Sequence, residues 1–465
     1  MSTKPTPYDK ASVQSIFDYA KRLTGVALAD LLSGPELEAN QRNRGDMGSL
    51  VERHFFEHEP PNNREPDFAE AGLELKTTGV RQIEGDFVAK ERLVLTMIDF
   101  ESIVNEAWES STFLYKCNLM LILFYEYDRE TPVTRRRFVL EPLIHQLSEL
   151  GLRVKGHEVE FLKRQAVLVP AEDLAQIRRD WETIQAKVRN GKAHELSEGD
   201  TYYLGACRKG SGGPGETLRV QPFGLERAKG RAFSLKQGYM NKLIHYSQGK
   251  RGRLGVNEVS DFEQVTKQRF SPHLGRTIED LCHSFQIELK APRQRHLKRL
   301  VANRILEVDG IAPSELAMAD IEMKTVLLDG NGKLKEHLSF PSFRYMEIVN
   351  QQWEDSSFCE RLERRFLFVI FQKDSQGSER LKKVFYWNMP FADREEARRV
   401  WEDTKHRVSV DARDLPGARE SHVAHVRPHA RNAEDTEPTP QGEWLVKKGF
   451  WLNNRYVQDV IERFQ

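Results

Sequence analysis

Two patterns of apolar positions alternate along the first half of the chain. In residues 8–32 the apolar side chains recur with helical spacing, which predicts a helical unit. Residues 114–128 contain an apolar run too continuous for a half-exposed strand, so they predict a strongly buried one. We also expect a helix around 141–150 and a long exposed helix with salt-bridged faces over 171–192.

The short segment 72–78 places charged residues inside a strand pattern. Because side chains alternate along a strand, Glu74 and Lys76 project from one face and the neighbouring leucines from the other. A proline precedes Asp67 and favours an extended or turned entry to a hairpin that returns to Glu74. Carboxylates beside one ammonium form an oxygen-rich site that suits Mg²⁺ and a phosphate substrate. The same spacing also occurs by chance in solvated hairpins, so the flanking residues must decide between a metal site and a solvated hairpin.

Composition restricts the class of protein. The chain has 465 residues, enough for two or three domains, and its 30% charged and 39% hydrophobic residues are typical of a globular protein. The formal net charge is zero, so any phosphate-binding surface must be local. Four cysteines lie far apart without a C-x-x-C pair, which indicates reduced thiols in the cytoplasm and no zinc site. The longest apolar run, 119–125, is too short to span a membrane.

The residues around the charged strand carry a specific family resemblance. The pattern N-x-G-x-x-G-x-x-x-E at 43–52 precedes P-D-F at 66–68 and A-G-L-E-L-K-T at 71–77. Together they resemble the signature of the MutH family of mismatch-repair endonucleases and, more closely, the GATC-cutting type II restriction enzymes related to it. The resemblance implies an α/β fold of the PD-(D/E)XK restriction-endonuclease kind, with a mixed central sheet flanked by helices.

The resemblance also implies which residues form a Mg²⁺-dependent active site. It assigns the catalytic and metal-binding roles to carboxylates, one backbone carbonyl and two lysines: Glu52, Asp67, Glu74, Leu75, Lys76 and Lys116. Metal binding falls to the carboxylates and the Leu75 carbonyl, whereas Lys76 would orient water and donate to the phosphate. Lys116 comes at the start of the buried strand, where a strand-edge lysine in solvent is an equally good interpretation.

A strand that ends in Arg208 and Lys209 leads into a Gly-rich loop and is expected to enter a DNA groove. In the family this junction carries an arginine that reads the target bases, so the resemblance implies base contacts from these two residues. Arginine can donate two hydrogen bonds to guanine O6 and N7. The alternative is that both residues neutralise phosphates without reading sequence.

Beyond a polar, Gly-containing linker at 247–262, the chain repeats its own pattern. The sequence L-E-L-K-T at 73–77 returns as I-E-M-K-T at 321–325, and other segments recur in the same order. We therefore expect a tandem duplication of the nuclease fold. It would consist of a catalytic domain at 1–246 and a degenerate DNA-binding domain at 263–465.

The second copy lacks most of the catalytic set. Glu322 and Lys324 persist, but without a partner carboxylate they should hold Mg²⁺ poorly, so we predict that this copy is not catalytic. The residues at the places of Glu52, Asp67 and Lys116 are, in that order, Ala302, Glu315 or Ala317, and Arg361-Leu362. Catalysis in the second copy is the weaker alternative.

The second copy keeps features that favour DNA binding. Residues 425–433 resemble the family's base-reading segment more closely than the first copy does, and residues 290–304 form the densest basic stretch of the chain. That stretch predicts a helix whose apolar residues face inward and whose basic residues face outward. We predict DNA contacts from four residues of these segments: Arg427, His429, Lys298 and Arg299.

These inferences describe a type II restriction endonuclease. It would cut double-stranded DNA before the G of GATC and leave 5′-phosphate ends, and a cognate methyltransferase is expected in the same system. Because two cuts at a palindrome need two active sites, we expect self-association on DNA, with the second copy binding another site as an effector. Two alternatives stay open: a strand-nicking mismatch-repair endonuclease and a non-catalytic DNA-binding regulator. A generic structural protein would bind no DNA.

Overall fold

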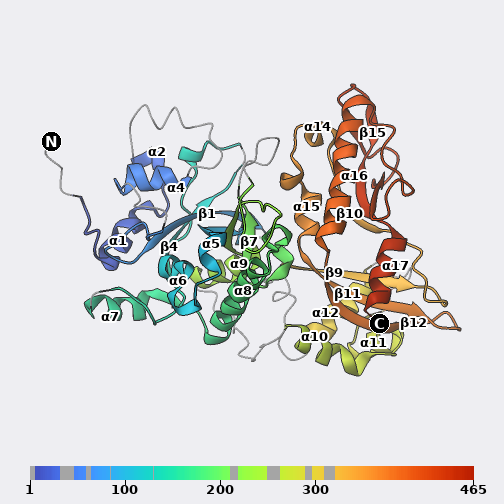
Figure 1. Cartoon of the computed structure of the whole chain (residues 1–465), viewed down its shortest axis with the longest axis horizontal. Coiled ribbons are helices and arrows are strands. Elements are labelled where there is room, and N and C mark those ends of the chain that lie inside the picture. The colour runs from blue at the N-terminus through green and yellow to red at the C-terminus, as the bar shows by residue number, and fades with distance from the viewer. Residues whose placement is uncertain are drawn as a thin grey trace. The chain divides into compact units, whose positions relative to one another are not determined.

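The computed structural model divides the chain into two compact units (Figure 1). The first unit comprises Met1–Leu196, Asp200–Lys209 and Leu218–Glu258, and the second comprises Ser197–Gly199, Gly210–Thr217 and Val259–Gln465. The described residues are 6–31, 47–58, 64–83, 85–128, 130–154, 156–209, 218–248, 262–288, 296–307 and 320–464. Outside them lie Asn43, Gly45, Glu315, Ala317 and most of the expected linker, at 249–261.

A five-stranded mixed sheet forms the centre of the first unit, in the order β2-β1-β4-β5-β6. β1 and β4 run parallel, with Glu74 opposite Met120 and Lys76 opposite Ile122. β4 is buried along nearly all its length, as its continuous apolar run predicts. The strands of this sheet are β1 (Glu74–Ile83), β2 (Asp86–Ala89), β4 (Leu119–Glu126), β5 (Leu143–Gln146) and β6 (Ala166–Leu168).

A three-stranded antiparallel sheet, in the order β3-β8-β7, completes the first unit. Its strands are β3 (Leu93–Met97), β7 (Leu204–Arg208) and β8 (Arg231–Leu235). A π-helical turn, η3 (Val51–Phe55), directly follows one of the short helices, α4. The helices of this unit are α1 (Val13–Ala20), α2 (Leu28–Leu31), α4 (Met47–Leu50), α5 (Phe100–Ile103), α6 (Thr112–Cys117), α7 (Gly156–Gln165), α8 (Ala171–Arg189) and α9 (Gln237–Ser247).

Two helix predictions in the first unit need correction. The helix expected around 141–150 is wrong: this segment holds β5, because its four residues are all buried and pair with β4. The long helix expected over 171–192 is α8: one face is exposed and carries the predicted ion pairing, with Arg178 2.9 Å from Glu182, but the other face, with Trp181 and Ile184, is buried. Asp180 on the same face accepts hydrogen bonds of 2.6 to 3.0 Å from the amides of 202–204, and so fixes the start of β7.

The second unit repeats the parallel strand pair of the first. β9 pairs in parallel with β11, with Glu322 opposite Phe366 and Lys324 opposite Phe368. Its sheets have the orders β12-β11-β9, β10-β16-β13 and β14-β15. The strands are β9 (Ile321–Leu328), β10 (Leu338–Ser342), β11 (Arg365–Lys373), β12 (Glu379–Asn388), β13 (Ala424–Pro428), β14 (Thr436–Pro438), β15 (Trp444–Val446) and β16 (Lys448–Leu452). The helices are α10 (Phe262–Phe270), α11 (Ile278–Ser284), α12 (Leu297–Glu307), α14 (Tyr345–Ile348), α15 (Ser357–Leu362), α16 (Phe391–Val410) and α17 (Asn454–Arg463).

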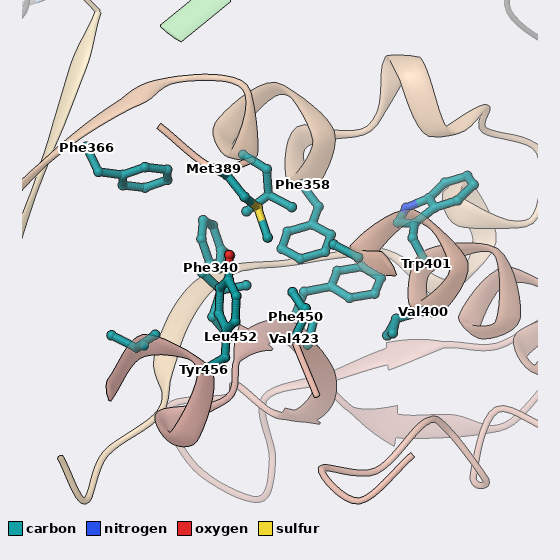
Figure 2. Close-up of a cluster of buried hydrophobic side chains, with 14 of the residues drawn as sticks. Phe340, Phe358, Phe366, Met389, Val400, Trp401, Val423, Phe450, Leu452 and Tyr456 are labelled. Carbon is teal, nitrogen blue, oxygen red and sulfur yellow. The ribbon is translucent and has the colours of Figure 1, made fainter. Parts of the chain in front are cut away.

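Aromatic side chains are prominent in the core of the second unit (Figure 2). Phe358 of α15 stacks on Phe450 of β16, with ring centroids 4.5 Å apart and an interplanar angle of 7°. In the same cluster, the rings of Trp353 and Trp401 lie 5.9 Å apart. This core joins α15 and α16 to the sheet β10-β16-β13. It therefore holds β13, which carries Arg427, in a fixed place.

Two features of the chain concern its thiols and its helices. All four cysteines are free and buried, so no disulfide supports the fold. Within the described ranges, no helix is long and apolar enough to cross a membrane.

His145 of β5 makes the stability of the first unit depend on pH. Burial lowers the pKa of this histidine to about 3, whereas it is about 6.5 in an unfolded chain. Between these values the unfolded chain binds a proton that the folded chain does not. The contribution of neutral His145 to the free energy of unfolding is therefore complete above about pH 6.5 and falls as the pH drops. We expect a loss of about 2 kcal/mol on going from pH 7.5 to pH 5. Urea unfolding of the wild type and His145→Gln at both pH values measures it, and an equal loss in both proteins would contradict it.

Candidate active site

The candidate active site lies at the start of β1. Phe68 and Leu73 exchange backbone hydrogen bonds of 2.9 and 3.2 Å, which close the predicted hairpin between Asp67 and Glu74. Gly72 completes the turn with a φ of +62°, a conformation that favours glycine. The hairpin therefore places the two acidic residues next to each other.

Hydrogen bonds fix both carboxylates. The amide of Asp67 donates to Glu74 Oε2 at 3.1 Å, and the amide of Leu75 donates to Asp67 Oδ2 at 2.8 Å. The Lys76 ammonium donates to Glu74 Oε1 at 2.5 Å. Asp67 is 6% exposed and Glu74 is 1% exposed, so both acidic groups are almost completely removed from water.

Glu52 and Lys116 reach this hairpin from separate helical elements. Glu52 lies in the π-helical turn η3, and single π-helical turns are frequent at functional sites. Lys116 lies in α6, with its Nζ 3.6 Å from Glu74 Oε1. Its expected place at the start of a strand is wrong, because Ser111 caps α6 by accepting a hydrogen bond of 3.1 Å from the Leu114 amide, and β4 begins only afterwards.

Burial and mutual repulsion make the site attractive to a cation. Burial raises the pKa of Glu74 to about 7, although Lys76 acts in the opposite direction. Burial also raises the pKa of Glu52, and the nearby charge of Asp67 adds to the rise. Burial lowers the pKa of Lys76, but Glu74 and Asp67 outweigh this effect and hold that pKa above its ordinary value. The site therefore gathers negative charge that Lys76 alone does not balance.

The oxygen atoms of the site fit a hard cation. Asp67, Glu74 and the Leu75 carbonyl supply oxygen ligands, and Mg²⁺ binds through one or two carboxylates while waters and a phosphate complete its shell. In the part of the chain that the structure describes, no group of three or more His, Cys, Asp or Glu side chains is arranged to hold a metal ion. Cys117 next to the site is buried, and burial raises the pKa of its thiol, so it stays protonated.

Three further residues beside the site are missed by the sequence patterns. The ring of His58 hydrogen-bonds the Asp67 carbonyl through Nε2 and so holds the entry to the hairpin. Arg64 and Arg219 line a pocket of about 340 Å³ together with Lys116. His58 and Arg219 come near the site only through contacts between distant segments. Arg64 could have been found from the sequence, because it lies only three residues before Asp67.

Arg208 and Lys209, the expected base-reading residues of the first copy, lie at the end of β7. Arg208 is partly buried and pairs across the sheet with Arg231 of β8. Lys209 is exposed, and its amide donates to the Gly230 carbonyl at 2.9 Å. Of the two side chains, Lys209 is therefore the more accessible to DNA.

In the second unit, cations neutralise the surviving carboxylate. Glu322 Oε1 lies 2.7 Å from Lys324 Nζ and 3.0 Å from Arg361 Nη1. Although burial acts to raise it, the pKa of Glu322 is held below its ordinary value by Lys324 and Arg361. Ala302 of α12 is completely buried and brings no carboxylate. The charge that would attract a metal ion in the first unit is therefore already paired in the second.

The predicted DNA contacts of the second unit lie on two elements. Arg427 is exposed at the end of β13, 5.6 Å from the centre of the Trp451 ring, and the His429 ring lies 5.5 Å from the same indole. On α12, Arg299 is exposed. The expectation that all basic residues of this helix face outward is wrong for Lys298. This lysine is partly buried and forms an ion pair of 2.9 Å with Glu379 of β12.

Comparison with protein families agrees with the two units. The model of the family "DNA mismatch repair enzyme MutH" matches residues 56–152 and again residues 309–401. The first match contains the hairpin and β1, and the second contains β9 with Glu322. Two segments of this mixed α/β chain are thus each similar to the MutH family.

The curated relatives of the chain include a type II restriction enzyme and several MutH proteins. It is 29% identical to the type II restriction enzyme Sau3AI of Staphylococcus aureus over 510 aligned positions, which cover 97% of this chain and 98% of that enzyme. It is 25% identical to the DNA mismatch repair protein MutH of Shewanella woodyi, over 51% of this chain and 94% of that protein. The MutH protein of Pasteurella multocida is 24% identical, over 46% of this chain and 89% of its own length.

Proposed function

We propose that the chain is a type II restriction endonuclease that cuts both strands of DNA before the G of GATC and leaves 5′-phosphate ends. The observation that carries the proposal is the cluster of charged residues around the start of β1, in which Asp67, Glu74 and Lys116 are buried and Glu52 and Lys76 are half-buried. This is the arrangement expected of a PD-(D/E)XK nuclease. Similarity to Sau3AI along nearly the whole chain favours restriction over repair.

The residues of the cluster divide the work of phosphodiester hydrolysis. Mg²⁺, when bound, lowers the pKa of a water molecule and stabilises the negative charge on the phosphate and the leaving oxygen. Asp67, Glu74 and the Leu75 carbonyl would hold this ion, and Glu52 would add a further oxygen. The Lys76 ammonium, which hydrogen-bonds Glu74, would orient the attacking water and donate to the phosphate. Lys116 would add a second positive contact to the phosphate oxygens.

We assign different roles to the two halves of the chain. Residues 1–246 would form the catalytic domain, which pairs with another copy on a palindromic site. Residues 263–465 would bind a second copy of the site as an effector, because Glu322 is neutralised there while Arg427, His429 and Arg299 remain available for DNA. A methyltransferase of the same specificity would protect the host DNA.

A strand-nicking repair enzyme is the second candidate. The observation that favours it is the alignment of MutH from Shewanella woodyi, which spans 94% of that protein but only 51% of this chain. One MutH-like unit is therefore about the size of a whole repair protein, but the second unit, which such a protein lacks, argues against this candidate. Nicking restricted to hemimethylated DNA would support this candidate.

Cleavage of unmethylated plasmid DNA in Mg²⁺, with sequencing of the ends, tests the proposal. Cuts in both strands before GATC, lost in EDTA, are expected, as is faster cutting of plasmids with two sites than with one. Equal rates on the two plasmids would remove the effector role. Specific binding in Ca²⁺ without cutting in Mg²⁺ would leave the non-catalytic regulator as the better interpretation.

A further inference from the structure

The loop that leads into β8 exposes a group of apolar side chains. Val220 is 57% exposed, Phe223 is 76% exposed and Leu225 is fully exposed, at 103%. Single exposed apolar residues are common on protein surfaces, whereas several together indicate a contact surface. The loop 218–228 therefore presents a small apolar tip to its surroundings.

Hydrogen bonds hold this loop in one conformation. Arg219 and Ala228 exchange backbone hydrogen bonds of 2.7 and 2.9 Å, which close its base. The buried side chain of Gln221 accepts a hydrogen bond of 2.7 Å from the Ala193 amide and donates to the Glu226 carbonyl. Because the backbone is anchored at several points, the apolar tip is a defined shape on the surface.

The backbone of Phe223 is strained. Its φ is +61°, in the left-handed region that a bulky aromatic residue seldom adopts. The neighbouring Gly224 packs directly against Gly191, where an added Cβ would lie 2.6 Å from the Gly191 carbonyl oxygen. A glycine or asparagine would suit position 223 better, so a phenylalanine there points to a use for its exposed ring.

The charges around the tip favour a nucleic acid as its partner. Residues 218–229 contain Arg219, Arg227 and Lys229 but a single acidic residue. The base of the loop lies near one edge of the candidate active site, because Arg219 lines the same pocket as Lys116. A partner that meets this surface must combine negative charge with flat apolar groups, and stacked bases between phosphates provide both.

We infer that the tip of loop 218–228 is a wedge that inserts Phe223, supported by Leu225, between base pairs of the DNA bound to the first unit. The inference rests on the proposed function, since it needs DNA on that unit. Apolar side chains placed between base steps partly unstack them and bend the duplex. The bend would be made beside the scissile phosphate, where the pocket of Arg219 and Lys116 lies.

Base unstacking in the full-length protein tests the wedge. The probe is a GATC duplex with 2-aminopurine at successive positions, bound in Ca²⁺ so that it is not cut. Wild-type protein should increase the fluorescence at one step. Phe223→Asn, which suits the left-handed backbone, should lose that increase and bind at least about fivefold more weakly without a lower melting temperature. Leu150→Asn, at a leucine that is 77% exposed elsewhere on the first unit, is the matched control and should behave as the wild type.

The outcomes separate the wedge from the proposed function. Specific cutting by the wild type, with equal fluorescence and affinity in Phe223→Asn, would overturn the wedge alone. A change in the sedimentation of DNA-free Phe223→Asn, with DNA binding unaltered, would also overturn it and identify a second copy of the chain as the partner. Absence of both binding and cutting in the wild type would overturn the proposed function, and the wedge with it.

Discussion

Glu74→Gln is expected to lower the rate of Mg²⁺-dependent cleavage at least about 1000-fold. The substitution keeps the shape of the side chain but removes the charge that Lys76 and Lys116 approach at 2.5 and 3.6 Å. The loss of several kcal/mol of charge stabilisation corresponds to such a factor. Single-turnover cleavage of a labelled duplex measures the rate, and binding of the same duplex in Ca²⁺ shows that the variant is folded.

Glu322→Gln is the matched control, because Glu322 occupies the corresponding strand position in the second unit. Its carboxylate is already paired with Lys324 and Arg361, so its removal should change the chemical step little. Cutting that survives Glu74→Gln but fails in Glu322→Gln would move the catalytic centre to the second unit. That result would overturn the assignment of the two domains.

Lys116→Arg is expected to reduce cleavage about 100-fold, although it keeps the positive charge. The second unit provides the reason, because Arg361 forms an ion pair of 3.0 Å with Glu322, whereas Lys116 stays 3.6 Å from Glu74. A guanidinium binds a carboxylate through two donors and would compete with Mg²⁺ for Glu74. The rate should therefore recover in part as the Mg²⁺ concentration is raised.

Lys116→Met separates the loss of positive charge at position 116 from the competition of a guanidinium with Mg²⁺ for Glu74. It removes the cation without adding a guanidinium that competes for Glu74, so its loss of rate should not be relieved by additional Mg²⁺. If Lys116→Arg cleaves like the wild type, charge alone matters at position 116, and the comparison with Arg361 gives no reason for the proposed lack of catalysis in the second unit.

Local spacing predicts how the residues at the centre of the candidate site lie, whereas their assignment to a nuclease site rests on the family resemblance. Glu74 and Lys76 needed only the alternation of a strand, and Asp67 needed only a short hairpin that returns the chain to its start. The same strand alternation predicts the strand of the second unit that carries Glu322 and Lys324. Each of these features is determined within about ten residues, where backbone geometry leaves few choices.

The remainder depended on contacts that spacing does not encode. Lys116 looked like the first residue of a strand, because the six-residue helix α6 is too short for a periodic pattern and only its Ser111 cap marks it. The sequence pattern predicts a helix where β5 lies, because the burial of its four residues comes from their pairing with β4. His58 could not have been singled out, because its role comes from the folded position of the Asp67 carbonyl.

Under the proposed division of roles, the ion pairs of the second unit also determine how readily evolution could restore catalysis there. A glutamate restored at Ala302 would enter a completely buried position, and Arg361 would still occupy the carboxylate of Glu322. A lysine restored at Arg361 would still lack the second acidic group. We therefore expect that neither substitution alone would create a second catalytic centre, so the proposed effector unit would not regain cleavage in one step and cut DNA independently of the first unit.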